Sequence, residues 1–193
     1  MARDEKDKGP VAINGELQYT SVSQLQKAAG CLRQWAMPRL FGFPKPKESV
    51  GQKKGKAGHE RIEHYLTKGD NVLGLLERPA FERGFIPAPR PDLRVEYEIS
   101  NIDAQGVPMI GYIDLVDPQS ARGGLELVDW KYKKDIEQWG SKSGDLVDPS
   151  KDVGVQMIAY AVAIAKELGL PGSAIVRLRH VEIQHTGKVD ARE

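Results

Sequence analysis

Apolar residues recur at helical spacing in two segments of the first third of the chain. The first predicted helix begins with a capping box at Ser23 and Gln26, and its apolar pattern continues until Pro38 interrupts it. A second helix is predicted over residues 51–68, and a shorter helical piece over 71–77 precedes a proline-rich connector. The apolar residues that share one side of the second helix are Ile62, Tyr65 and Leu66.

The pattern then changes to the alternation that is typical of strands. Three strands are predicted, at residues 93–100, 108–117 and 125–132, and their short glycine-containing links favour an antiparallel meander. A polar loop over 134–151 precedes a largely buried helix over 152–168. A last strand, 174–183, follows this helical crossover and can therefore join the sheet in parallel. The order is αβββαβ, which indicates an α/β protein with a central mixed sheet flanked by helices and an N-terminal helical segment.

Composition is that of one ordinary globular domain. The chain has 193 residues, of which 40% are hydrophobic and 28% are charged. Residues 1–18 are polar without clear periodicity, so we expect a flexible N-terminal arm and a single domain over 19–193. No apolar run approaches the roughly 20 residues that cross a bilayer, and the first residues lack the apolar stretch of a signal peptide, so we expect a cytoplasmic protein without membrane contact. The single cysteine, Cys31, excludes a disulfide within the chain.

The formal net charge of only +1 does not indicate a nucleic-acid-binding protein. Its distribution is uneven, however, since nine Lys and Arg against two Glu lie between Lys27 and Arg61. This stretch is either a phosphate-binding patch or a solvated basic loop. The candidate phosphate contacts are Arg33, Lys53, Lys54 and Lys56.

Three residues on neighbouring predicted strands can form a metal site. The period of two places Asp129 and Lys131 on one face of their strand, and antiparallel pairing can bring Asp114 beside them. Two carboxylates and the backbone carbonyl of Trp130 are hard oxygen ligands that suit Mg²⁺ or Mn²⁺. The alternative is that these residues form ordinary strand-end salt bridges. The apolar residues around Asp114 and Asp129 favour a functional site, because unpaired charge is costly in a buried strand.

Five separate segments together resemble the PD-(D/E)XK nuclease superfamily, and within it the RecB-like exonuclease branch that includes CRISPR-associated and phage enzymes. The matching residues are Ser21, Ser23, Leu25, Cys31, Arg33 and Trp35 in the first helix; Gly55, His59 and Glu63 in the second; Gly111 with Asp114; Asp129 with Lys131; and Gln156 with Tyr160. They occur in the family's order and cover roughly residues 20–165, within the element order found from the apolar pattern.

The resemblance implies a restriction-endonuclease-like core and assigns roles to these residues. His59, Asp114, Asp129 and the Trp130 carbonyl would bind the metal, and Lys131 would orient or deprotonate the attacking water. The remaining candidates for site support or DNA contact are Gln156, Tyr160, Glu96 and Glu63. Relatives with an iron–sulfur cluster carry three further cysteines near the C-terminus, which this chain lacks, so no cluster is expected.

We therefore expect a Mg²⁺-dependent deoxyribonuclease, most simply an exonuclease that hydrolyses phosphodiester bonds in DNA repair, recombination or phage DNA processing. Its partner would be DNA, either single- or double-stranded. Two alternatives stay open from the sequence. One is a catalytically inert module that binds DNA or docks on a protein partner in a recombination or repair complex. The other is an endonuclease that acts on structured DNA.

Overall fold

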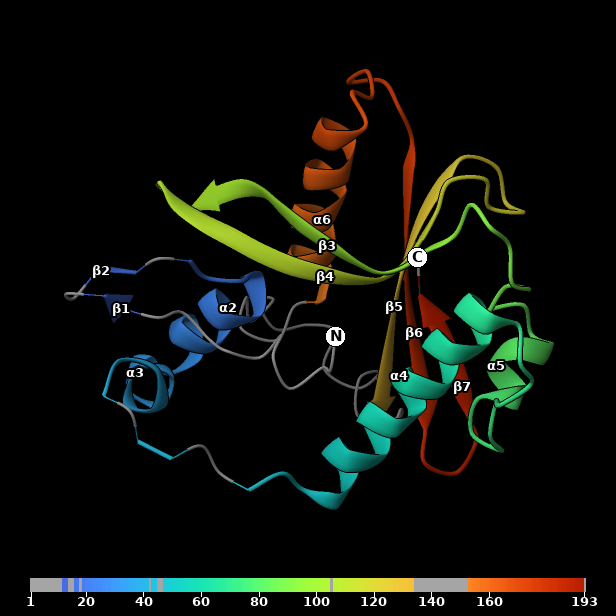
Figure 1. Cartoon of the computed structure of the whole chain (residues 1–193), viewed down its shortest axis with the longest axis horizontal. Helices are drawn as coiled ribbons and strands as arrows, with labels where there is room; N and C mark the ends of the chain where they lie inside the picture. Colours follow the sequence, from blue (N-terminus) through green and yellow to red (C-terminus); the bar gives the residue numbers. More distant parts are fainter. Residues whose placement is uncertain are drawn as a thin grey trace, which may run out of the picture. The chain divides into compact units, whose positions relative to one another are not determined.

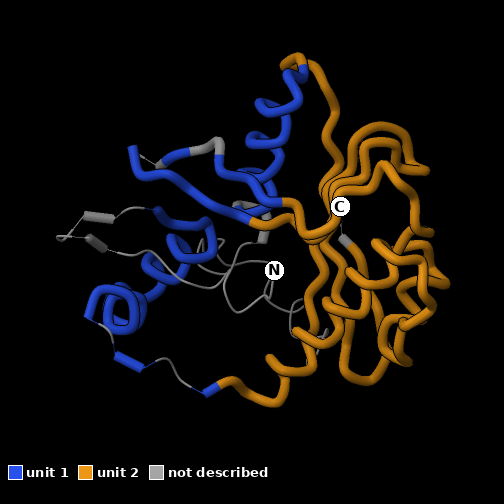
Figure 2. Tube along the Cα trace, viewed as in Figure 1, with its two compact units in different colours: residues 1–47, 98–111, 147–170 blue, residues 48–97, 112–146, 171–193 orange. Residues whose placement is uncertain are grey.

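The computed structural model describes residues 12–13, 16–17, 19–41, 43–44, 47–104, 106–133 and 153–192. The chain divides into two compact units, which Figure 2 distinguishes by colour. Unit 1 comprises residues 1–47, 98–111 and 147–170, and unit 2 comprises residues 48–97, 112–146 and 171–193. The prediction of a single domain over 19–193, like that of a flexible arm over 1–18, stays a prediction.

A mixed five-stranded sheet confirms the predicted α/β architecture. Its strands follow the order β3 (Arg94–Ala104), β4 (Val107–Asp117), β5 (Leu125–Lys133), β6 (Val176–Gln184) and β7 (Val189–Arg192), as Figure 1 shows. β4 and β5 are antiparallel, whereas β5 and β6 are parallel along their whole length, from Leu125–Val176 to Lys133–Gln184. Helix α6 (Val153–Glu167) provides the crossover that parallel pairing requires. β7, which pairs antiparallel with β6, was not predicted.

Helix α4 (Val50–Lys68) begins and ends at local sequence signals. The Ser49 hydroxyl accepts a hydrogen bond from the Gln52 N–H, and the Gln52 side chain accepts one from the Ser49 N–H, which together form a capping box. Gly69 ends the helix with a φ of 77°, a conformation that glycine adopts without steric cost. The predicted helix over 51–68 is confirmed.

Unit 2 has one hydrophobic core, formed by α4, by the segment around α5 (Arg78–Glu82), and by strands β4–β7. In Figure 1, α4 runs alongside β5, against which it packs. The buried core residues are Ile62, Tyr65, Leu66, Leu73, Ala80, Ile86, Leu115, Val128, Trp130, Val181, Ile183 and Val189. The helix predicted over 71–77 is wrong, because the helix begins only at Arg78, with a proline in its first turn.

Unit 1 contains two N-terminal helices where one was predicted. α2 (Val22–Gly30) and α3 (Leu32–Leu40) are separated by Cys31, whose extended backbone (φ −160°) interrupts the hydrogen-bond ladder. The cap of α2 is Ser21 rather than Ser23. Pro38 does not end the helix, because it lies inside α3, which continues to Leu40.

Two very short strands, β1 (Ala12–Ile13) and β2 (Glu16–Leu17), pair antiparallel within the N-terminal segment. Thr20 then bridges to Met109 of β4, and so connects the segment before α2 to the sheet within unit 1. The loop predicted over 134–151 lies outside the described residues. Among the helices that are described, none has the length and hydrophobicity to span a membrane.

Candidate functional site

Three potential metal ligands from three elements of unit 2 lie close together. His59 of α4, Glu96 of β3 and Asp114 of β4 each offer a ligand atom, and these atoms all lie within 4.8 Å of one another. His59 Nδ1 is 3.4 Å from Asp114 Oδ1. Two carboxylates and an imidazole form a donor set that suits a hard or borderline divalent cation such as Mg²⁺ or Mn²⁺.

The Asp114 carboxylate is held by the backbone of the next strand. Its Oδ2 accepts a hydrogen bond of 2.8 Å from the buried Trp130 N–H. The paired residues of β4 and β5 run from Asp117–Glu126 to Leu115–Val128. Beyond this last pair, the Asp114 side chain accepts the hydrogen bond of the Trp130 N–H. This contact fixes the carboxylate while Oδ1 remains directed to His59.

Glu96 has an unusual backbone conformation. Its φ of 49° lies in the left-handed region, and no other non-glycine residue in the described part of the chain has a positive φ. Such a conformation costs about 1–3 kcal/mol and is concentrated at functional sites. The strain falls on the strand residue whose carboxylate lies near His59 and Asp114.

His59 is placed by close packing between α4 and β5. Gly58 lets the Tyr132 ring lie directly against the helix, because a Cβ at this position would be 2.0 Å from Tyr132 Cζ. The rings of His59 and Tyr132 have their centroids 5.6 Å apart. The Tyr132 hydroxyl donates a 2.7 Å hydrogen bond to Glu77, a fully buried carboxylate.

Glu77 is the centre of a buried polar network that the sequence did not reveal. Arg61 donates to both of its carboxylate oxygens, at 3.1 and 2.8 Å, and the Gly74 N–H donates to one of them. Burial favours the neutral acid, but the hydrogen bonds from Arg61 and Tyr132 outweigh it and lower the pKa of Glu77. Burial, together with the bond to Glu77, raises the pKa of Tyr132. The network therefore contains a carboxylate and a neutral phenol.

Asp129 and Lys131 lie on the same face of β5, as their spacing predicts. Lys131 Nζ is 2.5 Å from Asp129 Oδ1, and His180 Nδ1 of β6 is 3.0 Å from Asp129 Oδ2. Burial disfavours the charged form of Asp129, but Lys131 and His180 outweigh it and lower its pKa to about 2. Asp129 is therefore an anion at neutral pH, and the Lys131 side chain remains 38% exposed and accessible to a substrate.

The structure brings together part of the predicted ligand set. His59 and Asp114 meet as expected, and Glu96 joins them, whereas Asp129 is not in that group. Trp130 contributes its N–H to Asp114. The ligand roles of Asp129 and of the Trp130 carbonyl stay predictions.

Gln156 and Tyr160 form a pair on α6 in unit 1. Gln156 Nε2 donates a 2.8 Å hydrogen bond to the Tyr160 hydroxyl oxygen. The Tyr160 ring packs against Gly111 of β4, where a Cβ would be 2.5 Å from the ring. Within unit 1 the two residues thus support the strand that carries Gly111, and their contact with DNA stays a prediction. Glu63, on α4, is partly exposed and is not in the metal-binding group.

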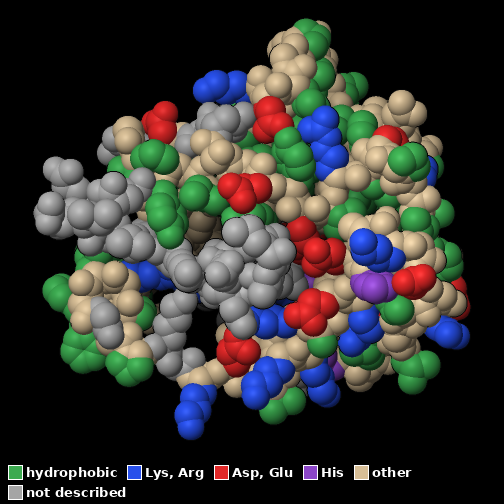
Figure 3. Space-filling view, viewed as in Figure 1, with side chains coloured by type: hydrophobic (Ala, Val, Ile, Leu, Met, Phe, Trp, Pro, Cys, Tyr) green, Lys and Arg blue, Asp and Glu red, His purple; other side chains and the backbone are tan. Residues whose placement is uncertain are grey.

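The predicted phosphate contacts lie on two helices. Arg33 on α3 and Lys53 and Lys54 on α4 are exposed, while Lys56 forms an ion pair of 2.5 Å with Glu48. In the view of Figure 3, Lys and Arg side chains lie among Asp and Glu side chains over the described surface. These four residues remain candidates for DNA binding.

His180 and Glu182 lie next to the predicted site residue Asp129 in the charged contacts of β5 and β6, and the sequence did not reveal them. His180 Nε2 is 3.3 Å from Glu182 Oε1, both side chains are buried, and His180 also contacts Asp129. The available signal was the presence of ionisable residues in an otherwise apolar strand. Only the parallel register, which pairs Asp129 with His180, shows what they contact.

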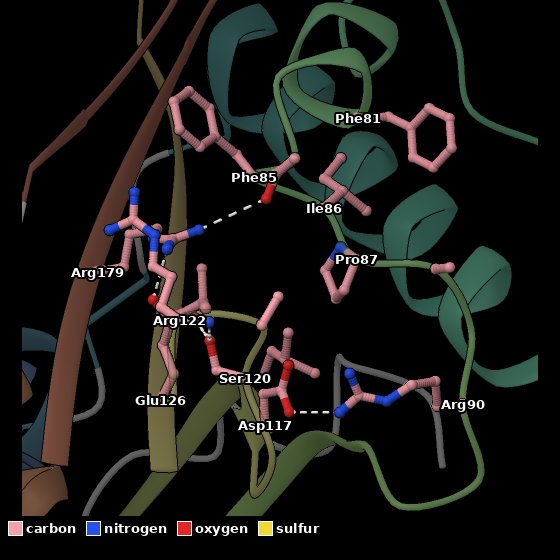
Figure 4. Close-up of a pocket in the computed structure, with 15 residues that line it drawn as sticks. Phe81, Phe85, Ile86, Pro87, Arg90, Asp117, Ser120, Arg122, Glu126 and Arg179 are labelled. Atoms are coloured by element: carbon pink, nitrogen blue, oxygen red, sulfur yellow. Dashed lines mark hydrogen bonds and ion pairs between the residues drawn. The ribbon is translucent and has the colours of Figure 1, made fainter. Parts of the chain in front are cut away.

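A cavity of about 400 Å³ lies elsewhere in unit 2 (Figure 4). Four of its charged residues form ion pairs: Arg179 with Glu126 at 2.7 Å, and Arg90 with Asp117. Burial lowers the pKa of Arg179, against the effect of Glu126. None of the three metal-ligand candidates lines this cavity, so it is separate from the candidate site.

Comparison with known families agrees with this geometry. The model of the PD-(D/E)XK nuclease superfamily matches residues 75–192, a range that includes Glu96, Asp114, Asp129 and Lys131 but not His59. The comparison with curated proteins gives no match. Nucleases of this superfamily use divalent metals, and the group of His59, Glu96 and Asp114 can bind one. The chain belongs to the PD-(D/E)XK nuclease superfamily.

Proposed function

We propose that this chain is a RecB-like exonuclease that hydrolyses phosphodiester bonds in DNA with Mg²⁺ or Mn²⁺. The observation that carries the proposal is the convergence of His59, Glu96 and Asp114 from three separate elements. Asp114 is also bonded to β5, the strand that carries Asp129 and Lys131. Together, the three ligand candidates and these two residues of β5 supply the acids and the lysine that metal-assisted hydrolysis requires.

The chemistry follows from the donors and from the lysine. A divalent cation bound by His59, Glu96 and Asp114, with Asp129 as a further ligand, would polarise the phosphodiester and lower the pKa of a water molecule. Lys131 is held by an anionic carboxylate and is partly exposed. Its ammonium group can orient the attacking water and stabilise the charge that develops on the phosphoryl oxygens.

The RecB-like assignment rests on the motifs outside the superfamily match as well as within it. The His59 helix and the opening segment with Ser21 and Cys31 support this branch, as do Gln156 and Tyr160. We propose DNA repair, recombination or phage DNA processing as the setting, because end-directed digestion of DNA serves each of these processes. A protein partner in a recombination or repair complex belongs to the same proposal.

The test is DNA cleavage by the purified chain with Mg²⁺, Mn²⁺ or EDTA. Linear single-stranded DNA, linear duplex and covalently closed circles are compared, and the expected result is metal-dependent digestion of linear DNA alone. Asp129→Ala, Lys131→Ala and Glu96→Ala should each reduce the rate by at least about 100-fold, on the scale of lost transition-state stabilisation. Glu98→Ala is the matched control, since Glu98 is an exposed acid two residues further along β3.

Each of the other possible results would indicate a different function. Cleavage of covalently closed circles would indicate an endonuclease and contradict the exonuclease assignment. DNA binding without cleavage in any metal would indicate an inert module. Cleavage that persists in both Asp129→Ala and Lys131→Ala would place the chemistry elsewhere.

A further inference from the structure

A continuous row of ionisable side chains crosses from β5 to β6. We call Lys131, Asp129, His180, Glu182 and Lys133 the charged row. The parallel register places Asp129 opposite His180 and Lys131 opposite Glu182, so these side chains project from the same face of two hydrogen-bonded strands. The contacts along the row measure 2.5 Å for Lys131–Asp129, 3.0 Å for Asp129–His180, 3.3 Å for His180–Glu182 and 2.5 Å for Glu182–Lys133.

The centre of the charged row is buried at considerable cost. Asp129, His180 and Glu182 are 5%, 9% and 1% exposed. Buried ion pairs are weak contributors to stability, and apolar side chains of similar size would fill the same space at least as well. Glu182 illustrates the cost, because its Oε2 is buried without a hydrogen-bond partner, while Oε1 accepts from Lys133 and lies 3.3 Å from His180 Nε2. Packing alone therefore does not account for these residues.

His180 fixes the direction of the Asp129 carboxylate. Its two ring nitrogens face two different carboxylates, Asp129 through Nδ1 and Glu182 through Nε2. A ring with both nitrogens in contact with carboxylates cannot rotate without breaking one of these contacts. The Asp129 Oδ2 is thereby held toward β6, and Oδ1 is left to Lys131.

We propose that His180, anchored by Glu182, is a positioning residue that orients Asp129 for metal binding and thereby sets the place of the Lys131 ammonium. The inference rests on the proposed function, because it concerns the same site. Carboxylates and histidines behind metal ligands commonly orient those ligands, and their loss typically costs about 10- to 100-fold in metal affinity or activity.

Three substitutions of His180 separate positioning from packing. The amide nitrogen of His180→Asn can occupy the place of Nδ1 and still donate to Asp129, whereas His180→Gln places its amide near Nε2 and loses that bond. His180→Leu loses both bonds. We expect His180→Asn to stay within a few-fold of the wild type, and His180→Gln and His180→Leu to lose about 10- to 100-fold.

Glu126→Gln is the matched control for structural damage. Glu126 is also a buried acid of β5 that pairs with a buried residue of β6, Arg179, at 2.7 Å. Glu126 lies three residues from Asp129 along the strand, and its ion pair is with Arg179 rather than with a member of the charged row. If the charged row served stability alone, His180→Leu and Glu126→Gln would both lower the melting temperature, and both would keep the wild-type Mn²⁺ affinity and kcat.

The readouts are Mn²⁺ affinity of the free protein, cleavage rate at saturating Mn²⁺, KM for DNA and melting temperature. The expected pattern is weaker Mn²⁺ binding and a lower kcat in His180→Gln and His180→Leu, with unchanged KM. Mn²⁺ affinity and kcat should both be unchanged in Glu126→Gln. Wild-type Mn²⁺ affinity and kcat in His180→Leu would overturn the positioning role, as would equal losses in Glu126→Gln. A wild-type chain that binds Mn²⁺ without cutting DNA would contradict the proposed function, and the Mn²⁺ affinities alone would then decide on His180.

Discussion

Gly58 is the position where a single methyl group should damage the framework of the site. A Cβ there would lie 2.0 Å from Tyr132 Cζ and 2.2 Å from its hydroxyl oxygen, so the ring must move and its 2.7 Å bond to Glu77 must break. Overpacking costs about 1–3 kcal/mol, and the loss of a hydrogen bond to a charged group costs about 1.5–3 kcal/mol. Alanine regains about 1 kcal/mol of helix propensity.

The expected net loss for Gly58→Ala is about 1.5–5 kcal/mol in the free energy of unfolding, which for a chain of this size lowers the melting temperature by about 3–20 °C. Gly55→Ala is the matched control one turn earlier, because its Cβ would meet Tyr132 Cβ at 3.5 Å, an ordinary contact. This control should be neutral or more stable by up to about 1 kcal/mol. Urea and thermal denaturation measure both variants, and equal stability of the two would refute the role assigned to the contact between Gly58 and Tyr132.

Three further predictions concern the buried network and the tyrosine of unit 1. Tyr132→Phe should lower the free energy of unfolding by about 1.5–3 kcal/mol in urea titrations, because Glu77 loses a donor; a neutral result would contradict the bond. The pKa of Glu77 is lower in the folded protein than its ordinary value of 4.5, so ionised Glu77 stabilises the fold above about pH 4.5. This stabilisation is lost as the pH falls below that value. The stability gap between the wild type and Glu77→Gln should therefore narrow below about pH 4.5, and a gap that widens there would have the wrong sign. Gly111→Ala should displace the Tyr160 ring and lower the melting temperature by several degrees, whereas an unchanged melting temperature would mean that the ring relocates without cost.

Local signals made most of the secondary structure predictable. The alternation in β3, β4 and β5 and the glycine after α4 identified those elements directly from the sequence. The break at Cys31 was not predictable in this way, because the apolar spacing continues through it and only the extended backbone at that residue separates the two helices. β7 is four residues long, too short for a periodic pattern to emerge.

The part of the site that consists of charged residues in apolar strands could be predicted from residue type alone. Asp114, Asp129 and Lys131 were found as charges within apolar strands, and the family resemblance added His59. The contacts of Glu77 and His180 depend on tertiary packing and on the register of β5 with β6, which no local pattern specifies. The left-handed backbone of Glu96 is likewise a consequence of the folded strand.

A crystal structure of the protein with Mn²⁺ tests the central claim most directly. The account predicts an anomalous peak within about 2.5 Å of ligand atoms of His59, Glu96 and Asp114, the range of metal–ligand bonds to N and O donors. The peak should disappear in Asp114→Ala while the fold is retained. A Mn²⁺ ion bound elsewhere in a crystal whose His59, Glu96 and Asp114 remain without metal would contradict the account.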